Sequence, residues 1–254
     1  MAAANYLPEV LETTEAERLA TGFKFTEGPL WHPDGFWYFV DLRSNRLHRV
    51  TPGKPAELVV NTVGGNGTTF DLQGRLLICE GDARRVSRLT ADGKLEPVAE
   101  RYNGGRFNRP NDIVCRSDGS IFFTDPEKRV PFKDREIAGP PGAENLWDGA
   151  AVYRMATDGA ITMVANFEYP NGLAFSPDEK TLYVANTRSS KYIHAIAVDL
   201  RNHERIGLPD LRGLLRHDAF GAKIRTVVRR VRHVHQLGKD DAGDRRELHS
   251  RQLH

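Results

Sequence analysis

Cysteine is scarce in this chain, and long apolar runs are missing from it. Only two cysteines, Cys79 and Cys115, occur among the 254 residues. Each lies in a short apolar run, which favours burial as a small apolar side chain over a disulfide or a reactive thiol, so a catalytic cysteine is not expected. The longest apolar runs are far too short to cross a bilayer, which excludes a helical membrane span.

Several signals of location and chemistry are also missing. The first 18 residues lack a basic region followed by a hydrophobic core, so we expect no signal peptide and a cytoplasmic protein. Ser117 and Ser176 lie in turns without a nucleophile-elbow motif, and the three histidines of the first 200 residues have no metal-ligand spacing. The glycine-rich segments lack both a following helix and a phosphate-binding lysine. A nucleophilic serine and a nucleotide site are therefore not expected.

What the chain does contain is a unit that recurs four times. The clearest copy, Tyr169 to Asn186, reads YPNGLAFSPDEKTLYVAN: a turn pair, a short apolar run, a second turn, and an apolar run that closes on a polar residue. From the second residue of the turn pair to the closing residue is 13 positions in three copies and 14 in the fourth. The copies begin at 28, 67, 112 and 172, a spacing typical of propeller blades with one insertion.

Each unit predicts four short strands. Two further strand-like runs around a Pro-Gly or Asp-Gly turn follow the first three copies, and the first blade spans about Phe25 to Asn61. We therefore predict an all-β fold with four recognisable β-propeller blades. The segment from Pro126 to Gly149, rich in proline and glycine, is expected to form a loop over one face. The third strand of the fourth blade is expected within Ser190 to Leu200.

The remaining residues, 201–254, have a different composition. They carry 13 basic and 7 acidic residues and six of the nine histidines, whereas residues 1–200 carry 23 basic and 27 acidic residues. We expect residues 1–200 to form an incomplete propeller domain and residues 201–254 an atypical Arg/His-rich tail, either disordered or translated out of frame. A basic amphipathic helix is the alternative, but its apolar positions are mostly valine and it lacks aromatics. We therefore expect neither a nucleic acid nor a membrane as a partner.

Equivalent positions in a radially repeated fold form a ring. The positions just before the first strand of each blade hold one carboxylate and three amides, whose hard oxygen ligands suit calcium, and magnesium or manganese less strongly. The alternative is that the asparagines are ordinary turn formers. A glutamate is a poor turn residue, and a carboxylate that faces a narrow channel needs a partner or a raised pKa. The ring consists of Glu27, Asn66, Asn111 and Asn171.

Three motifs resemble one known family. TEGPLWHPDGFWYFVD, FNRPNDIVCRSDGSIFFTDP and YPNGLAFSPDEKTLYVAN look like blade motifs of the family that groups gluconolactonase, senescence marker protein (regucalcin) and luciferin-regenerating enzyme, and resemble its bacterial gluconolactonase branch most. The resemblance covers about residues 25–200. It implies a six-bladed β-propeller that hydrolyses sugar lactones with one divalent cation in its central channel. That cation is usually calcium, with zinc, magnesium or manganese as alternatives.

The resemblance also implies roles for individual residues. Glu27, in E-G-P, matches a metal-binding glutamate, and Asn171, in P-N-G-L, matches a metal-binding asparagine. Asn111, in R-P-N-D, matches an asparagine that lines the metal and substrate site, and Arg109 matches an arginine that contacts the sugar. Three of these positions belong to the ring that repeat alignment gave independently.

One implied residue departs from the family pattern. An aspartate that serves as ligand and general base normally lies in an L-P-D-G motif of the fifth blade. Asp210 is the candidate here, but Leu211 replaces the glycine and no strand-like run follows. Blades five and six are not recognisable, so we expect weak or absent lactonase activity from this chain. The alternative is a non-catalytic calcium-binding or protein-binding propeller, and the oligomeric state is left open.

Overall fold

The computed structural model describes residues 16–126, 150–187 and 192–198. Strands dominate it, with one 3-10 turn at Leu42–Ser44. The first sheet contains β1 (Thr26–His32), β2 (Phe36–Asp41), β3 (Arg46–Val50) and β4 (Glu57–Asn61). The second contains β5 (Gly65–Phe70), β6 (Leu76–Glu80), β7 (Arg85–Leu89) and β8 (Leu95–Ala99). The third contains β11 (Ile113–Cys115), β12 (Ile121–Asp125), β13 (Ala150–Met155) and β14 (Ile161–Phe167). The fourth contains β15 (Pro170–Phe175), β16 (Thr181–Asn186) and β17 (Tyr192–Ala197).

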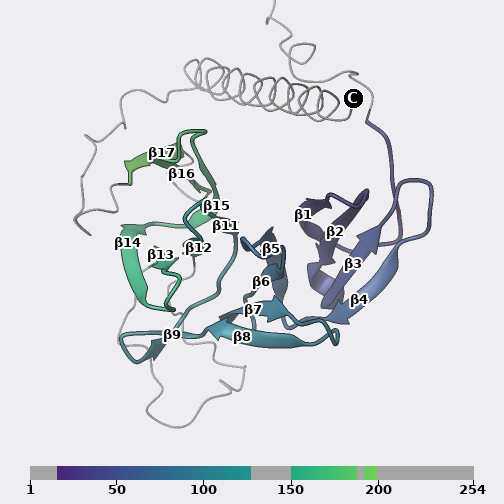
Figure 1. Ribbon diagram of the computed structural model, residues 1–254, viewed down its shortest axis with the longest axis horizontal. Helices are drawn as coiled ribbons and strands as arrows, with labels where there is room; N and C mark the ends of the chain where they lie inside the picture. The colour runs from purple at the N-terminus through teal and green to yellow at the C-terminus, as the bar shows by residue number, and fades with distance from the viewer. Residues whose placement is uncertain (1–15, 127–149, 188–191, 199–254) are drawn as a thin grey trace, which may run out of the picture.

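The four sheets are arranged as propeller blades. Neighbouring strands within each sheet follow one another in the chain and pair antiparallel. The first strands of the sheets, β1, β5, β11 and β15, lie toward the centre and contact one another in chain order, while β4, β8 and β14 lie outside (Figure 1). The predicted all-β fold with a four-blade propeller arrangement is confirmed. A small hairpin of β9 (Arg101–Tyr102) and β10 (Gly105–Arg106), between the second and third blades, was not predicted.

Apolar side chains that alternate along the second strands hold the blades together. Successive side chains of a strand point to opposite faces of its sheet. A strand whose sheet packs between two other sheets therefore has apolar side chains on both faces. In β6, Leu76 and Ile78 pack toward the first sheet, whereas Leu77 and Cys79 pack toward the third. In β12, Phe122 packs instead against the fourth sheet. These three seams between sheets form the hydrophobic core.

Some expectations concern residues that the structure places only in part. Cys79 is buried and Cys115 is partly buried, and both are free thiols, in line with the expected packing role. The expected loop from Pro126 to Gly149 and the tail at 201–254, which includes Asp210, lie outside the described residues, apart from Pro126 itself. The domain boundary at residue 200 also lies there and stays a prediction. Within the part of the chain that is described, no helix has the length and apolarity needed to cross a bilayer.

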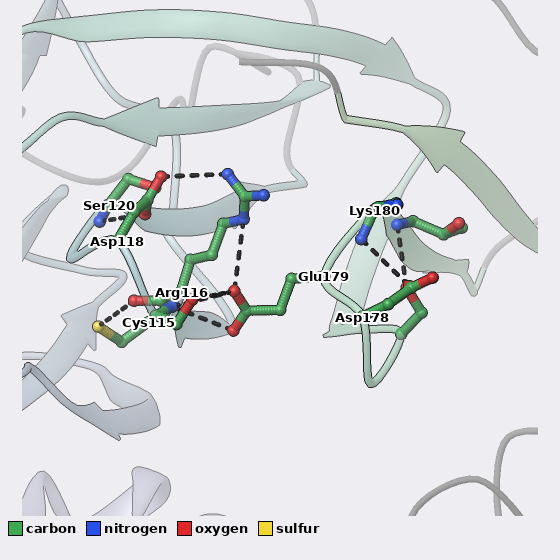
Figure 2. Close-up of polar contacts among 10 residues, drawn as sticks. Cys115, Arg116, Asp118, Ser120, Asp178, Glu179 and Lys180 are labelled. Atoms are coloured by element: carbon green, nitrogen blue, oxygen red, sulfur yellow. Dashed lines mark hydrogen bonds and ion pairs between the residues drawn. The ribbon is translucent and has the colours of Figure 1, made fainter. Parts of the chain in front are cut away.

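The third and fourth blades are joined by a polar contact between their first turns. Figure 2 shows Glu179, in the turn between β15 and β16, directed at Arg116 and the neighbouring turn between β11 and β12. The Glu179 carboxylate accepts hydrogen bonds from the backbone N–H of Ser117 at 3.0 Å and from its hydroxyl, and it lies 3.6 Å from Nε of Arg116. The φ of Glu179 is 53°, in the left-handed region where the equivalent turns have Gly35, Gly74 and Gly119. Glycine adopts this backbone conformation more easily than glutamate does, but only the glutamate side chain can make the contact between blades.

Replacing Glu179 by glutamine is expected to destabilise the protein by about 1 kcal/mol, because the hydrogen bonds from Ser117 lose their charge assistance and the ion pair with Arg116 is lost, while the backbone stays unchanged. Urea denaturation measures the change in the free energy of unfolding. The matched control is Glu96→Gln, which removes a partly exposed pair with Arg88 inside one sheet and is expected to cost less than about 0.5 kcal/mol. Equal losses in the two variants would contradict a role in joining the blades.

Candidate metal and substrate site

The polar residue that closes each repeat has one structural role in all four blades. It ends the second strand, is buried, and accepts a hydrogen bond from a backbone N–H of the segment that enters the first strand. A buried acceptor on a backbone donor satisfies both groups and fixes the segment that carries the ring residue. The pairs are Asp41 with Phe25 N–H at 3.1 Å, Glu80 with Val63 N–H at 2.9 Å, Asp125 with the N–H groups of Asn108 and Arg109, and Asn186 with Tyr169 N–H at 2.6 Å.

The hydrogen bonds that the Asp41 carboxylate accepts predict that its contribution to stability depends on pH. Burial alone would raise the pKa of Asp41, but hydrogen bonds from Ser44 and from the backbone N–H groups of Lys24 and Phe25 hold it below its ordinary value. A lowered pKa means that Asp41 contributes stability above the unfolded-state pKa of about 3.9, and that this contribution is lost as the pH falls through the folded-state pKa. Asp41→Asn should therefore cost about 1–2 kcal/mol at pH 7 and progressively less below about pH 4. Urea denaturation over that pH range measures the difference in the free energy of unfolding between the two proteins. A difference that does not change with pH would contradict this role of the Asp41 carboxylate.

The ring residues lie on bulges of the first strands. The pairing register shifts by one residue between Glu27 and Leu30 in β1, and the same shift flanks Asn66 in β5 and Asn171 in β15. A bulge re-aims the side chain of its extra residue, and bulges are frequent beside active sites. Asn111 lies two residues before β11, where its N–H donates to the carbonyl of Thr124 at 2.9 Å. Four equivalent positions therefore share one placement at the entrance to the first strands.

Close backbone contacts connect these positions from blade to blade. A Cβ built on Gly28 would lie 2.3 Å from the carbonyl oxygen of Asn66, so only glycine fits beside Glu27. Thr68 donates its hydroxyl to the carbonyl of Gly28 at 2.8 Å. In the next seam, the N–H of Gly67 donates to the carbonyl of Asn111 at 2.7 Å. The ring residues of the first three blades are therefore held on adjacent backbones.

Asp112 continues this chain of contacts into the fourth blade. It stands where the other blades have the glycine of the turn pair, and its Oδ2 accepts a hydrogen bond from the backbone N–H of Leu173 at 3.0 Å. Burial raises the pKa of Asp112, although the N–H groups of Leu173 and Ile113 act in the opposite direction. The sequence reasoning treated Asp112 only as a turn residue. An acid at a position that is glycine in the other repeats was the signal that could have identified it.

Glu27 and Asp112 form a pair of like charges. Burial raises the pKa of Glu27, and the charge of Asp112 raises it further, while a hydrogen bond from the backbone of Gly28 lowers it. Within the described residues, neither carboxylate has an ion pair with a basic side chain. Two partly desolvated carboxylates, one from the first blade and one from the third, whose charges oppose each other are an environment that a divalent cation would stabilise.

The donor set fits a hard cation. In the described part of the chain, no group of three or more His, Cys, Asp and Glu residues is placed to hold a metal ion, which is the kind of cluster a zinc or copper site would use. The predicted ligands are instead one carboxylate, Glu27, and the amides of Asn111 and Asn171, with Asp112 next to them. Carboxylate and amide oxygens with few charges suit calcium. Their assignment as metal ligands stays a prediction.

Arg109 approaches this ring from the segment before β11. It lies two residues ahead of Asn111, its backbone N–H is bonded to Asp125, and its Nη2 lies 3.1 Å from Oδ1 of Asp82. Arg109 therefore lies two residues from a ring position with its side chain oriented by Asp82, and its predicted contact with the sugar stays a prediction. Asp82 was not identified from the sequence, since nothing in its turn distinguishes it from a solvent-exposed acid.

Curated relatives of this chain include lactonases. The chain is 29% identical to a gluconolactonase of Zymomonas mobilis over 223 residues, which are 81% of this chain and 60% of the relative. It is 28% identical to a pentonolactonase of Haloferax volcanii over 205 residues, 75% of this chain and 63% of that protein. The chain thus spans about 60% of the length of these curated relatives.

A solved structure and a family model agree with these relatives. A gluconolactonase of Xanthomonas campestris is 36% identical and superposes with a TM-score of 0.63 over 71% of this chain and 61% of that one. Residues 25–207 match the model described as the SMP-30/Gluconolactonase/LRE-like region, which covers all four blades. The repeated blades, the ring positions and this match together show that the chain belongs to the SMP-30/gluconolactonase/LRE-like family.

Proposed function

We propose that this protein hydrolyses sugar lactones at the ring, with a divalent cation, calcium first, held by Glu27, Asn111 and Asn171. The observation that carries the proposal is the partly buried Glu27 carboxylate of the first blade, whose pKa is raised by burial and by the charge of Asp112 from the third blade. Names of relatives support the substrate class, since gluconolactonase and pentonolactonase both act on sugar lactones. When bound, the cation would polarise the lactone carbonyl and stabilise the negative charge that develops on its oxygen.

The chain's own residues would bind and orient the substrate. Arg109 carries a guanidinium of the kind that binds the hydroxyl groups of a sugar, and the Asn111 amide lies two residues further along the chain. Asp112, next to Asn111, accepts a hydrogen bond from the N–H of Leu173 at 3.0 Å, and its ionised carboxylate is the described group suited to accept a proton from water. The other candidate base, Asp210, lies outside the described residues.

The test is lactone hydrolysis followed as acid release in a pH-stat. Purified protein with glucono-1,5-lactone and calcium is expected to release acid faster than the spontaneous reaction. The excess rate should disappear with a chelator and in Glu27→Gln. A rate that neither treatment changes would contradict the proposal.

Cation binding without turnover is the second candidate function. The observation that favours it is in the sequence: Asp210 is the only candidate for the family's second acid, and Leu211 replaces the glycine that follows this acid in the family motif. Calorimetric calcium binding in a protein that leaves the lactone at its spontaneous rate would support this function, and turnover comparable to that of the lactonase relatives would exclude it.

A further inference from the structure

Asn66, the ring residue of the second blade, has the same placement as two of the predicted ligands, although the family resemblance assigned it no role. In three of the first strands, the residue that pairs with the closing polar residue directly precedes the ring residue. These pairs are Thr26 with Asp41, Gly65 with Glu80, and Pro170 with Asn186. The bulge that follows each pair therefore carries Glu27, Asn66 and Asn171 at equivalent positions.

The backbone around Asn66 is fixed by close contacts on both sides. The segment reads GGNG, so Asn66 is its only residue with a side chain. A Cβ on Gly65 would lie 2.7 Å from Oγ1 of Thr62, and a Cβ on Gly67 would lie 2.5 Å from Oδ1 of Asp112. Larger residues would not fit at these two positions, and the position of the asparagine between them is therefore set by its neighbours.

The backbone conformation of Asn66 does not explain why this residue is an asparagine. Asparagine is common in turns partly because it tolerates a left-handed backbone. Asn66 does not adopt that conformation. Among the residues that the structure describes, those other than glycine with a positive φ are Asn45, Arg84, Asn103 and Glu179. A left-handed turn is therefore not the reason for an asparagine at this position.

The side-chain amide of Asn66 also does not hold the chain in place. An asparagine with a structural role is recognisable at Asn186, whose Oδ1 accepts a hydrogen bond from the N–H of Tyr169 at 2.6 Å. Within the described part of the chain, the partly buried side chain of Asn66 makes no hydrogen bond, and the same holds for the side chains of Asn111 and Asn171. Polar groups removed from water are normally paired. Three ring amides that the described fold does not use are therefore available to a ligand.

We propose that Asn66 donates a further oxygen to the cation of the ring, an inference that rests on the proposed function. Calcium takes about six to eight oxygen ligands, which is more than one carboxylate and two amides supply. An amide oxygen from the second blade adds a donor without adding a charge. The second blade lies between the blades of Glu27 and Asn111, so Asn66 supplies a donor from the one described blade that otherwise lacks one.

Calorimetric titration of the full chain with calcium tests this role without depending on turnover. Asn66→Asp keeps the shape of the side chain and adds one negative charge to the ring. It is expected to bind calcium about tenfold more tightly than the wild type, because the charge of the ligands sets the affinity of calcium sites. Asn66→Ala removes the oxygen and should bind calcium about threefold to tenfold more weakly.

Two controls separate binding of the cation from general effects of charge and folding. Asn61→Asp changes the net charge equally, but Asn61 is exposed at the end of β4, the outer strand of the first blade, so its calcium affinity should equal that of the wild type (Figure 1). In urea denaturation with a chelator, Asn66→Ala should keep the wild-type midpoint, because its amide holds no part of the described fold. Asn45→Ala should lower the midpoint, because Oδ1 of Asn45 accepts a hydrogen bond from the N–H of Gly64 at 2.9 Å.

The outcomes distinguish a failure of this inference from a failure of the proposed function. Wild-type calcium affinity in both Asn66 variants, or the same gain in Asn61→Asp, would overturn the role of Asn66. The proposed cation site would still stand if Glu27→Gln abolished calcium binding in the same titrations. Calcium binding in none of the proteins would overturn both. A gain specific to Asn66→Asp in a chain that leaves the lactone at its spontaneous rate would support the role of Asn66 and contradict the proposed hydrolysis.

Discussion

Replacing Glu27 by glutamine is expected to abolish the stabilisation of the protein by calcium. At a free calcium concentration 100 times the dissociation constant, the wild type should gain about 2.7 kcal/mol in the free energy of unfolding. The variant should gain almost none, because it lacks the charged ligand of the ring. Differential scanning calorimetry with calcium and with a chelator measures both values.

The same substitution should have the opposite effect in the absence of calcium. Glu27 is partly desolvated and faces Asp112, so its charge is unfavourable when no cation is present. Glu27→Gln should therefore raise the stability of the calcium-free protein slightly, by about 0.5 kcal/mol, a small value because the side chain is only partly buried. Glu57→Gln, which removes an exposed acid from the same sheet, should leave calcium stabilisation intact. A calcium effect of wild-type size in Glu27→Gln would contradict the assignment of Glu27 as a ligand.

Gly28→Ala is expected to be one of the most destabilising single substitutions in the described residues. The φ of Gly28 is 55°, so alanine would pay about 1–2 kcal/mol for the left-handed backbone. Its Cβ would also lie 2.3 Å from the Asn66 carbonyl oxygen, and relieving that overlap costs about 1–3 kcal/mol more. The total is about 2–5 kcal/mol, which urea denaturation can measure.

Gly35→Ala separates the two causes. Gly35 has a φ of 88°, but a Cβ there would meet no atom within 4 Å. This control therefore pays the backbone cost alone and should lose about 1–2 kcal/mol. If Gly28→Ala lost no more than Gly35→Ala, the close contact between the first and second blades would not be a determinant of stability.

The blade pattern was predictable from local signals. Hairpin turns and short apolar runs are encoded within about 15 residues, and their repetition at 28, 67, 112 and 172 gave the four-blade arrangement. The ring positions followed from the same alignment. The role of the closing polar residues did not, because the hydrogen bond that the Arg109 N–H donates to Asp125 spans 16 residues and depends on how the strands turn back.

Asp112 and Asp82, which were not identified from the sequence, have roles that depend on contacts between blades. Asp112 differs from an ordinary turn residue because it accepts a hydrogen bond from the backbone of Leu173, which belongs to a different sheet, and because its charge raises the pKa of Glu27. Asp82 acquires its importance from Arg109, on the next blade. A single sequence shows turns and strands, whereas the approach of one loop to another is fixed by the packing of whole sheets. The contacts that give both residues their roles are therefore absent from the sequence, although the acid at a glycine position was a signal for Asp112.

The most direct test of the cation site is a crystal structure of the chain soaked in manganese, a divalent cation with strong anomalous scattering that also prefers oxygen ligands. We expect one anomalous peak within about 2.0–2.6 Å of oxygens of Glu27, Asn111 and Asn171. The peak should be absent from crystals of Glu27→Gln. A peak at another place, or none at the ring in the wild type, would contradict the proposal that these residues hold a divalent cation.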